Sequence, residues 1–395
     1  MRKIIALIIV VSLLLCSCEN GNFAYINPEE KSEISAEENE FIKAVWLSYI
    51  EISELCKNLT ERQFRERLVD LTANLLSLKI NVLIVHAVAN CDSFYESEIL
   101  PKSRYINTDG EYDVFSVICE MCASVGIEIQ AWINPYRVSS ERDLSVLEKN
   151  KAVKKLYSEN KDNILICESG IYLNPAESEV QKHILDRARE IIAAYPVDAI
   201  HIDDYFYPDM AENADENSYK KYKENNGVLS VDSWRRENVN ALISSLHLLL
   251  NANGKKLVIS PAADIEKNYE NKYADIRLWL ENEWADEIVP QIYFGFENET
   301  APFERTLESW IKETENKKTK LIIGLAFYKC GNEDLFAGSG KNEWLENCDI
   351  IKRQISLIKS KNTICGVAFF SYSHIFGKNI KKIAKKELQN AKTVI

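Results

Sequence analysis

The stretch Ile200-His201-Ile202-Asp203-Asp204-Tyr205-Phe206-Tyr207-Pro208 sets the interpretation of the whole chain. It begins as a β-strand, in which Ile200 and Ile202 fall on one face of an extended backbone. His201 and Asp203 fall on the opposite face. The strand then runs into two adjacent carboxylates and three aromatic rings, a combination that is unusual for an element that serves only the core. We therefore expect its C-terminal end to carry a functional site.

Eight β-rich runs of this kind recur along the chain, each apolar for four or five residues and then polar and aromatic. They start near Ala44, Asn81, Ile127, Asp198, Lys256, Glu287, Lys320 and Thr363. Runs with apolar residues at helical spacing separate them, at 61–78, 113–125, 177–194, 231–250, 273–284, 302–312 and 344–359. Alternating β and α units imply parallel strands covered by helices. Eight repeats over about 335 residues predict a closed (β/α)8 TIM barrel, with a doubly wound open sheet as the alternative.

The first 40 residues resemble an export signal and a linker rather than part of the fold. Arg2 and Lys3 precede an apolar run, residues 4–15, that is too short to span a bilayer comfortably. The small Ser17 before Cys18 resembles a bacterial lipobox, in which the cysteine is lipidated and becomes the mature N-terminus. Ordinary secretion with cleavage nearby is the alternative. We expect a signal peptide at 1–17, a flexible linker at 18–40 and one catalytic domain at 41–395, tethered through Cys18 to the extracytoplasmic face of the cell membrane.

Charge and composition limit the partners and cofactors. The chain of 395 residues is 46% hydrophobic and 27% charged, as globular proteins are. Its net charge of −12 argues against a nucleic-acid partner, which would need a basic face. No GxGxxG or P-loop pattern is present and no histidines form an HxxxH pair, so we expect neither a cofactor nor a metal. Cys119 and Cys122 lie in a helix-like run without a second CxxC and are interpreted as buried thiols.

Polar and aromatic side chains share one face near the C-terminal ends of most of the predicted strands. In a barrel these ends meet in one bowl. Aromatic rings stack on the C–H faces of sugars, while amides and carboxylates bind sugar hydroxyls, so the bowl is predicted to bind a polysaccharide. The candidates that this pattern gives are Trp46, Glu51, His86, Gln130, Trp132, Asn134, Tyr136, His201, Tyr205, Gln291, Tyr293, Tyr328, Lys329, Tyr372, Ser373 and His374.

Glycoside cleavage typically needs two carboxyl groups, one as acid and one as base or nucleophile, roughly 5 to 9.5 Å apart. Asp203 is the first catalytic candidate because it shares the inward face with His201. The adjacent Asp204 should point differently, so it is expected to position the loop or a sugar hydroxyl rather than to complete an acid–base pair. The doublet could instead cap the following loop. The second carboxyl group is left open among Glu51, Asp264 and Glu297.

Segments along most of the chain resemble the glycosyl hydrolase-like 10 family. They are AVWLSYIEI, AWINPYRV, YLNP, DAIHIDDYFYP, DSWRRENVN, YADIRLWL, EIVPQIYFGF, LIIGLAFYK and FFSY, within about residues 41–376. The family comprises bacterial (β/α)8 proteins, often exported lipoproteins, related to enzymes that cleave denuded peptidoglycan glycan strands. The resemblance implies that the acidic motif is Asp203-Asp204, and that Trp132, Asn134, Tyr136, Arg137, Gln291 and Tyr293 line the groove. Asn174 and Tyr207, in the YLNP and DAIHIDDYFYP segments, join the substrate-binding candidates. One departure is Ser260-Pro261-Ala262-Ala263, where family members commonly read SPxG.

These observations favour a membrane-tethered glycoside hydrolase acting on a cell-wall polysaccharide, with peptidoglycan glycan strands as the expected substrate. In this hypothesis Asp203 is a nucleophile or stabilises an oxocarbenium-like transition state, and a second carboxyl group protonates the leaving oxygen. One alternative is a non-catalytic glycan-binding lipoprotein that keeps the aromatic groove. A metal-dependent deacetylase is another, although the histidine spacing does not support it.

Overall fold

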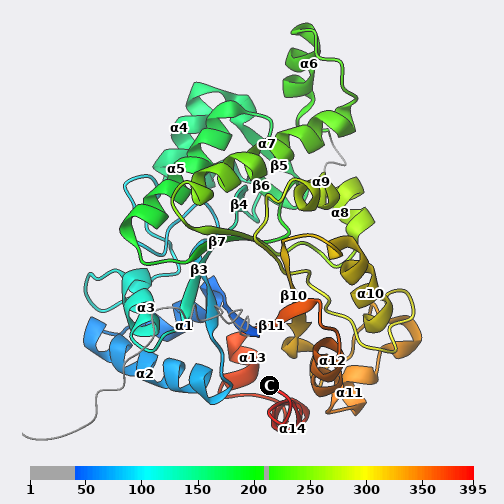
Figure 1. Cartoon of the computed structure of the whole chain (residues 1–395). Helices are drawn as coiled ribbons and strands as arrows, with labels where there is room; N and C mark the ends of the chain where they lie inside the picture. The colour runs from blue at the N-terminus through cyan, green and yellow to red at the C-terminus, as the bar shows by residue number, and fades with distance from the viewer. Residues whose placement is uncertain (1–40, 209–212) are drawn as a thin grey trace, which may run out of the picture. The chain divides into compact units, whose positions relative to one another are not determined.

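The computed structural model describes residues 41–208 and 213–395, so Cys18 and the predicted signal peptide and linker lie outside the described residues. Eight parallel strands close into a barrel in the order β1-β11-β10-β9-β8-β7-β3-β2 (Figure 1). The predicted (β/α)8 barrel is confirmed. The strands are β1 Ile42–Leu47, β2 Val82–Val88, β3 Glu128–Ile133, β7 Ala199–Ile202, β8 Lys256–Ile259, β9 Glu287–Ile288, β10 Lys320–Ala326 and β11 Ile364–Phe370.

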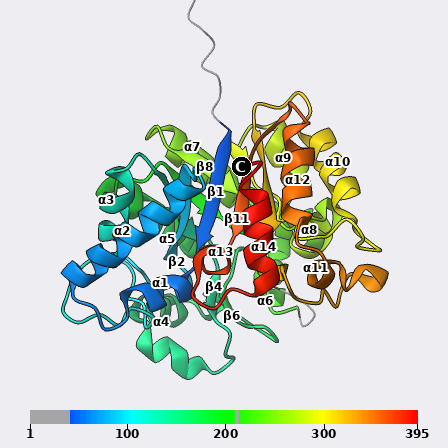
Figure 2. The same ribbon diagram turned by 90° about the horizontal axis from the view of Figure 1, so that it is seen from below.

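Helices surround the ring of strands (Figure 1). They are α1 Tyr49–Cys56, α2 Glu61–Ser77, α3 Val114–Ala123, α4 Lys151–Glu159, α5 Ser178–Ala194, α6 Glu216–Glu224, α7 Val231–Asn251, α8 Ile265–Asn271, α9 Ile276–Glu281, α10 Phe303–Thr314, α11 Glu343–Glu346, α12 Ile350–Lys359, α13 Tyr372–Phe376 and α14 Lys382–Ala391. The C-terminal α14 packs against α12 and α13 near β11 (Figure 2). Among the residues described, no helix has the length and apolarity that crossing a bilayer requires.

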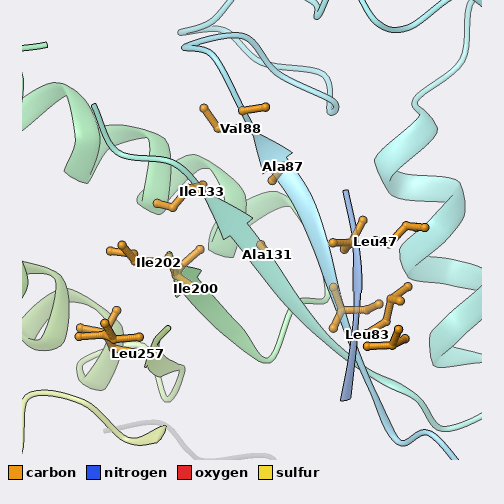
Figure 3. Close-up of a cluster of buried hydrophobic side chains, with 14 of the residues drawn as sticks. Leu47, Leu83, Ala87, Val88, Ala131, Ile133, Ile200, Ile202 and Leu257 are labelled. Atoms are coloured by element: carbon orange, nitrogen blue, oxygen red, sulfur yellow. The ribbon is translucent and has the colours of Figure 1, made fainter. Parts of the chain in front are cut away.

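The alternation of side chains along the strands divides the core into two layers. One layer lies between the strands and the helices, where Figure 3 shows Leu83, Ala131 and Ile200 with their neighbours. The other layer fills the interior of the barrel with Ala44, Trp46, Val82, Ile84, Trp132, Ala199, Val258, Val289, Ile322 and Ala368. The period of two along each strand produces both layers, because successive side chains point to opposite faces.

Polar side chains inside the barrel, toward the N-terminal ends of the strands, form hydrogen bonds and an ion pair with one another. Gln130 donates through Nε2 to Glu287 at 2.9 Å, and Glu287 pairs with Lys256 at 2.9 Å. Such pairing satisfies charges that would otherwise be costly to bury. These hydrogen-bonded side chains of Lys256, Glu287 and Gln130 therefore extend from the N-terminal ends of the strands into the barrel.

Three predicted elements differ from the structure. β9 holds two residues, because Pro290 has no N–H to continue the ladder; Gln291 then forms only isolated bridges. The helix expected at 273–284 is shortened to α9, which starts after its N-cap Asp275. The run at 344–359 is divided into α11 and α12.

The long connection between β3 and β7 builds a small sheet of its own. Its antiparallel strands are β4 Arg137–Ser139, β5 Ile164–Cys167 and β6 Gly170–Leu173, in the order β4-β6-β5. The described cysteines are free thiols, and Cys119 and Cys122 are buried in α3 as predicted. Burial raises the pKa of the Cys122 thiol to about 12, so it stays protonated.

Candidate active site

A cavity of about 690 Å³ opens at the C-terminal ends of the barrel strands. Carboxylates, imidazoles, two amides and several aromatic rings form its wall. The lining residues include Trp46, Tyr49, Glu51, His86, Trp132, Asn134, Arg137, Asp203, Asp204, Tyr205, Gln291, Tyr293, Tyr328, Phe370, Ser371, Ser373 and His374. Most of the predicted bowl residues are thus brought together.

Asp203 lies at the floor of this cavity and is only 3% exposed. Its Oδ2 accepts a hydrogen bond from the indole N–H of Trp132 at 2.9 Å, and its Oδ1 accepts one from the backbone N–H of Tyr205 at 3.3 Å. Burial, reinforced by the negative charge of Asp204, raises the pKa of Asp203 to about 7. A carboxyl group with such a pKa can hold a proton at neutral pH and release it during a reaction.

Asp204 lines the same cavity and is half-buried. The amide Nε2 of Gln291 donates to its Oδ1 at 3.3 Å. Burial raises the pKa of Asp204 as well. Burial thus disfavours the ionisation of both groups, and the negative charge of Asp204 further opposes that of Asp203.

Both carboxyl groups line the cavity, although they bond to different neighbours, Asp203 to Trp132 and Asp204 to Gln291. β7 ends at Ile202, so the alternation of an extended strand stops before Asp203. The backbone beyond that residue is free to direct both carboxyl groups into the cavity.

His86 and Trp132 form a stacked pair in the wall, with ring centroids 3.3 Å apart. Nδ1 of His86 accepts the backbone N–H of Tyr49 at 3.0 Å, so the ring proton of the neutral imidazole lies on Nε2. Burial lowers the pKa of His86 well below its usual range. His86 therefore offers a neutral N–H donor to a substrate.

Aromatic rings from several elements complete the wall. The guanidinium of Arg137 lies 5.6 Å from the ring centroid of Tyr205, which is 42% exposed. Tyr293 and Tyr328 meet edge to face, with ring centroids 5.8 Å apart. A mixture of exposed and half-buried rings around a polar floor suits a sugar chain.

Four predicted substrate contacts are corrected, because the structure buries them outside the cavity. His201 is fully buried in the barrel interior, where its Nδ1 lies 2.8 Å from Oε1 of Gln130. Tyr136 is 0% exposed and packs in the outer core. Asn174 donates to the carbonyl of Asp162 and to Ser218, and does not cap α5, whose N-cap is Glu177.

Tyr207 is the fourth, and it belongs to a buried ion-pair cluster. Its hydroxyl donates to Oδ2 of Asp215 at 3.0 Å, and Asp215 pairs with Arg235 at 2.6 Å. The guanidinium of Arg235 also donates to Tyr273 at 2.8 Å. Arg235, in the DSWRRENVN segment, thus holds the loop after β7 in place.

The three carboxylates considered as partners of Asp203 fall in different places. Glu51 lines the cavity, whereas Asp264 is the N-cap of α8 and Glu297 is exposed. Both oxygens of Glu51 accept hydrogen bonds, from the backbone N–H of Ser48 and Ser373 and from the hydroxyl of Ser371. Glu51 is therefore held in the wall rather than free to meet a substrate.

Sequence reasoning missed some lining residues. Tyr49 and Ser371 are examples, since neither falls at a predicted inward position. Glu51 was a candidate from its position, and the Ser48-x-x-Glu51 capping box, which the structure shows at the start of α1, could have indicated that its carboxylate bonds within the protein. Ala263, which stands where the family commonly has glycine, has no positive φ, so this backbone does not require glycine there. Within residues 41–208 and 213–395, no group of three or more His, Cys, Asp or Glu side chains is placed to hold a metal ion.

The fold and the cavity define a (β/α)8 barrel protein with carboxyl groups and aromatic rings gathered at the C-terminal ends of its strands. The chain belongs to the Glycosyl hydrolase-like 10 family, whose model matches residues 41–337. It is 28% identical to Glycosyl hydrolase YngK of Bacillus subtilis, over 82% of this chain and 68% of that protein. It is 26% identical to Glycosyl hydrolase DigH of Escherichia coli, over 94% of this chain and 92% of that protein.

Solved structures share the fold at low sequence identity. The PgaB (BpsB) glycoside hydrolase domain from Bordetella bronchiseptica is 10% identical, with a TM-score of 0.54 over 88% of this chain and 98% of that one. Alpha-L-fucosidase isoenzyme 2 from Paenibacillus thiaminolyticus is 12% identical, with a TM-score of 0.56 over 90% of this chain and 49% of that one. Both are glycosidase barrels, and the likeness concerns the fold alone.

Proposed function

We propose that this protein is a glycoside hydrolase that cleaves the glycan strands of peptidoglycan from the outer face of a membrane, to which a lipid on Cys18 tethers it. The observation that carries the hydrolase activity is the Asp203–Asp204 pair, which lies in an aromatic cavity with the pKa of both groups raised. Membership of the Glycosyl hydrolase-like 10 family supports the same reaction class.

The pair supplies two functions at once. Asp203, whose pKa is raised to about 7, can carry the proton near neutral pH, and Asp204 adds the second carboxyl group. The proton passes to the glycosidic oxygen as the bond to the anomeric carbon breaks, and the remaining charge stabilises the positive charge that develops on the sugar ring. Trp132 and Gln291 hold the two carboxyl groups in place through the hydrogen bonds described above. The acid therefore comes from the doublet itself rather than from a distant carboxylate.

The proposed substrate rests on the shape and chemistry of the cavity and on the N-terminal sequence. Rings along the wall can stack on successive sugars, and the neutral Nε2–H of His86 can donate to a hydroxyl or carbonyl oxygen. The lipobox-like Ser17-Cys18 would place the domain beside the cell wall. A peptide-stripped glycan strand offers a long chain of sugars without bulky side groups to enter the cavity.

Incubation of the purified protein with peptide-stripped glycan strands tests this proposal. We expect new reducing ends and short oligosaccharides, and loss of activity by about 10²- to 10⁴-fold in Asp203→Asn and Asp204→Asn. Glu297→Gln is the matched control, because this exposed carboxylate lies outside the cavity. Glycan binding without any product would instead identify a binding protein. Full activity in both Asn variants would rule out the pair as the catalytic group.

The tether is tested separately. Expressed in a bacterium, the whole chain should enter the detergent phase of a Triton X-114 extract, and Cys18→Ala should move it to the aqueous or secreted fraction. An unchanged distribution would contradict lipidation at Cys18 without touching the proposed reaction.

A further inference from the structure

Glu51, Ser371 and His374 form a hydrogen-bonded chain at the wall of the cavity. The hydroxyl of Ser371 donates to Oε1 of Glu51 at 2.7 Å, and its oxygen lies 3.0 Å from Nδ1 of His374. Glu51 is 8% exposed and Ser371 is 2% exposed, whereas His374 is exposed and lines the cavity. The chain thus connects a buried carboxylate to an imidazole that water and substrate can reach.

The hydrogen bonds fix which nitrogen of His374 carries the proton. A serine hydroxyl has a single hydrogen, and that of Ser371 is given to the carboxylate of Glu51. Toward His374 the Ser371 oxygen can therefore only accept, so Nδ1 of His374 carries the ring hydrogen. Nε2 is then left with a lone pair, and no hydrogen bond to a described residue occupies it. This ring offers an acceptor, the opposite of His86, whose Nε2 is a donor.

The barrel places His374 across the cavity from the aspartate pair. His374 lies in α13, directly after β11, and Asp203 directly follows β7. In the closed order of strands, β11 and β7 are separated by four steps in either direction. They occupy opposite sides of the ring, as Figure 1 also shows. A sugar bound between them would present one face to the acid and the other to the imidazole.

We propose that His374 is the general base that activates the attacking water, with Ser371 and Glu51 as the residues that position and polarise it. This inference rests on the proposed glycosidase activity and adds its stereochemistry. The water oxygen bonds to the anomeric carbon as its proton passes to Nε2 of His374. The bond from that carbon to the glycosidic oxygen breaks, and this oxygen takes the proton of the aspartate pair. One water is consumed, and proton exchange with solvent restores both groups.

The surroundings of His374 suit this role. Burial of part of the ring lowers its pKa, although the charge of Glu51 acts in the opposite direction, so the imidazole is neutral and able to accept a proton at neutral pH. Once it is protonated, Glu51 stabilises the imidazolium through Ser371. Tyr328 packs beside the ring, with centroids 6.0 Å apart.

This arrangement predicts inversion of the anomeric centre. Inverting enzymes leave room for a water between acid and base, whereas a retaining enzyme places a nucleophilic carboxylate against the sugar. The facing carboxylate here is Glu51, and its oxygens are occupied by the backbone N–H groups of Ser48 and Ser373 and by Ser371. A direct attack by Glu51 would break these bonds.

Proton NMR of the first products, recorded before mutarotation, tests the stereochemistry with the wild-type protein. We expect the anomer opposite to that of the cleaved bond. Products with the configuration retained would overturn the role of His374 while leaving the hydrolase activity standing. Absence of any hydrolysis by the wild type would overturn the proposed function and this inference together, so the two failures are distinct.

Substitutions test the residue itself. His374→Ala should lower kcat by about 10²-fold or more, and added imidazole should restore part of the rate with the same inverted product. Ser371→Ala keeps the imidazole but breaks its link to Glu51, and should lower kcat about tenfold while KM changes little. His247→Gln is the matched control, because His247 lies at the N-terminal ends of the strands. Thermal melts confirm that each variant is folded. An unchanged rate in His374→Ala, or a folded variant that imidazole does not rescue, would refute the proposal.

Discussion

The imidazole of His86 stacks on the indole of Trp132, and the edge of that indole donates to Asp203 at 2.9 Å. His86 of β2 is thus linked to Asp203, which follows β7, through the aromatic side chain of Trp132 in β3. The hydrogen bond favours the ionised form of Asp203, against burial and the charge of Asp204. The proton affinity of the pair is therefore set by neighbours from several strands.

Replacement of Trp132 tests this relationship. Trp132→Phe retains a ring but removes the N–H donor, so the ionised form of Asp203 loses its partner and the pKa of that carboxyl group rises. The acid then stays protonated to higher pH. We expect the basic limb of the kcat/KM profile to move upward by about one pH unit, measured with the glycan substrate. Trp279→Phe, which removes an indole hydrogen bond to Asn240 far from the acid, should leave the limb in place. A downward shift in Trp132→Phe would contradict the assignment.

Two substitutions distinguish the roles of the two ring nitrogens of His86, the acceptor Nδ1 and the donor Nε2. His86→Asn keeps an acceptor near the Nδ1 position for the Tyr49 N–H but lacks the donor at Nε2. It should lower kcat/KM about tenfold, equivalent to one substrate hydrogen bond, with little change in Tm. His86→Gln places its amide near the Nε2 position and leaves the Tyr49 N–H without a partner. This variant should lose more thermal stability and less kcat/KM. The assigned tautomer would be refuted if His86→Asn did not lose more kcat/KM than His86→Gln, or if His86→Gln did not lose more Tm than His86→Asn.

The fold was predictable from the sequence because parallel strands and helices have distinct periods. The runs that contain Ile200 and Ile202, or Leu321 and Ile323, are apolar over several residues and match strands β7 and β10. What the period cannot decide is how the chain turns after a strand ends. Asp204 lines the cavity because the chain leaves the extended conformation after Ile202, a turn that the strand period does not predict.

The same limit explains the residues that sequence reasoning placed wrongly. Tyr136 and Tyr207 follow strands but turn into the core, because a long loop can bury a ring that a strand would have presented. The pairing of Glu51 with Ser371 joins residues 320 positions apart, and no local pattern indicates it. The strand pattern predicted which end of the barrel carries the site. The conformation of the loops, which the pattern does not predict, determines which side chains line the cavity.

The ionisation of Asp203 should also appear in the stability of the protein. Its pKa in the folded state is raised from 3.8 to about 7, so the folded state holds a proton that the unfolded state releases between these values. The stabilising contribution of this proton is present below about pH 4 and is lost as the pH rises through about 7. Asp203→Asn does not titrate. We expect its Tm to exceed that of the wild type by a few degrees at pH 8, and by less at pH 4, in scanning calorimetry. A larger advantage at pH 4 would contradict the raised pKa.

The buried ion pair Asp215–Arg235 should contribute more to the stability of the fold than an exposed ion pair does. Asp215 is 2% and Arg235 4% exposed, and the pair holds Tyr207 and Tyr273 under the loop after β7. Asp215→Asn leaves the buried guanidinium with only the exposed Asp232, 4.0 Å away, as a counter-charge, which should cost about 3 kcal/mol of unfolding free energy in denaturant titrations.

The exposed pair Glu266–Arg277 is the matched control, since its side chains are 61% and 46% exposed. Glu266→Gln should cost less than about 1 kcal/mol, because water screens surface charges and replaces the lost contact. Equal losses in the two variants would show that the Asp215 cluster does not stabilise the fold through burial. A loss in Asp215→Asn alone would confirm that the buried ion pair of Asp215 and Arg235 stabilises the fold.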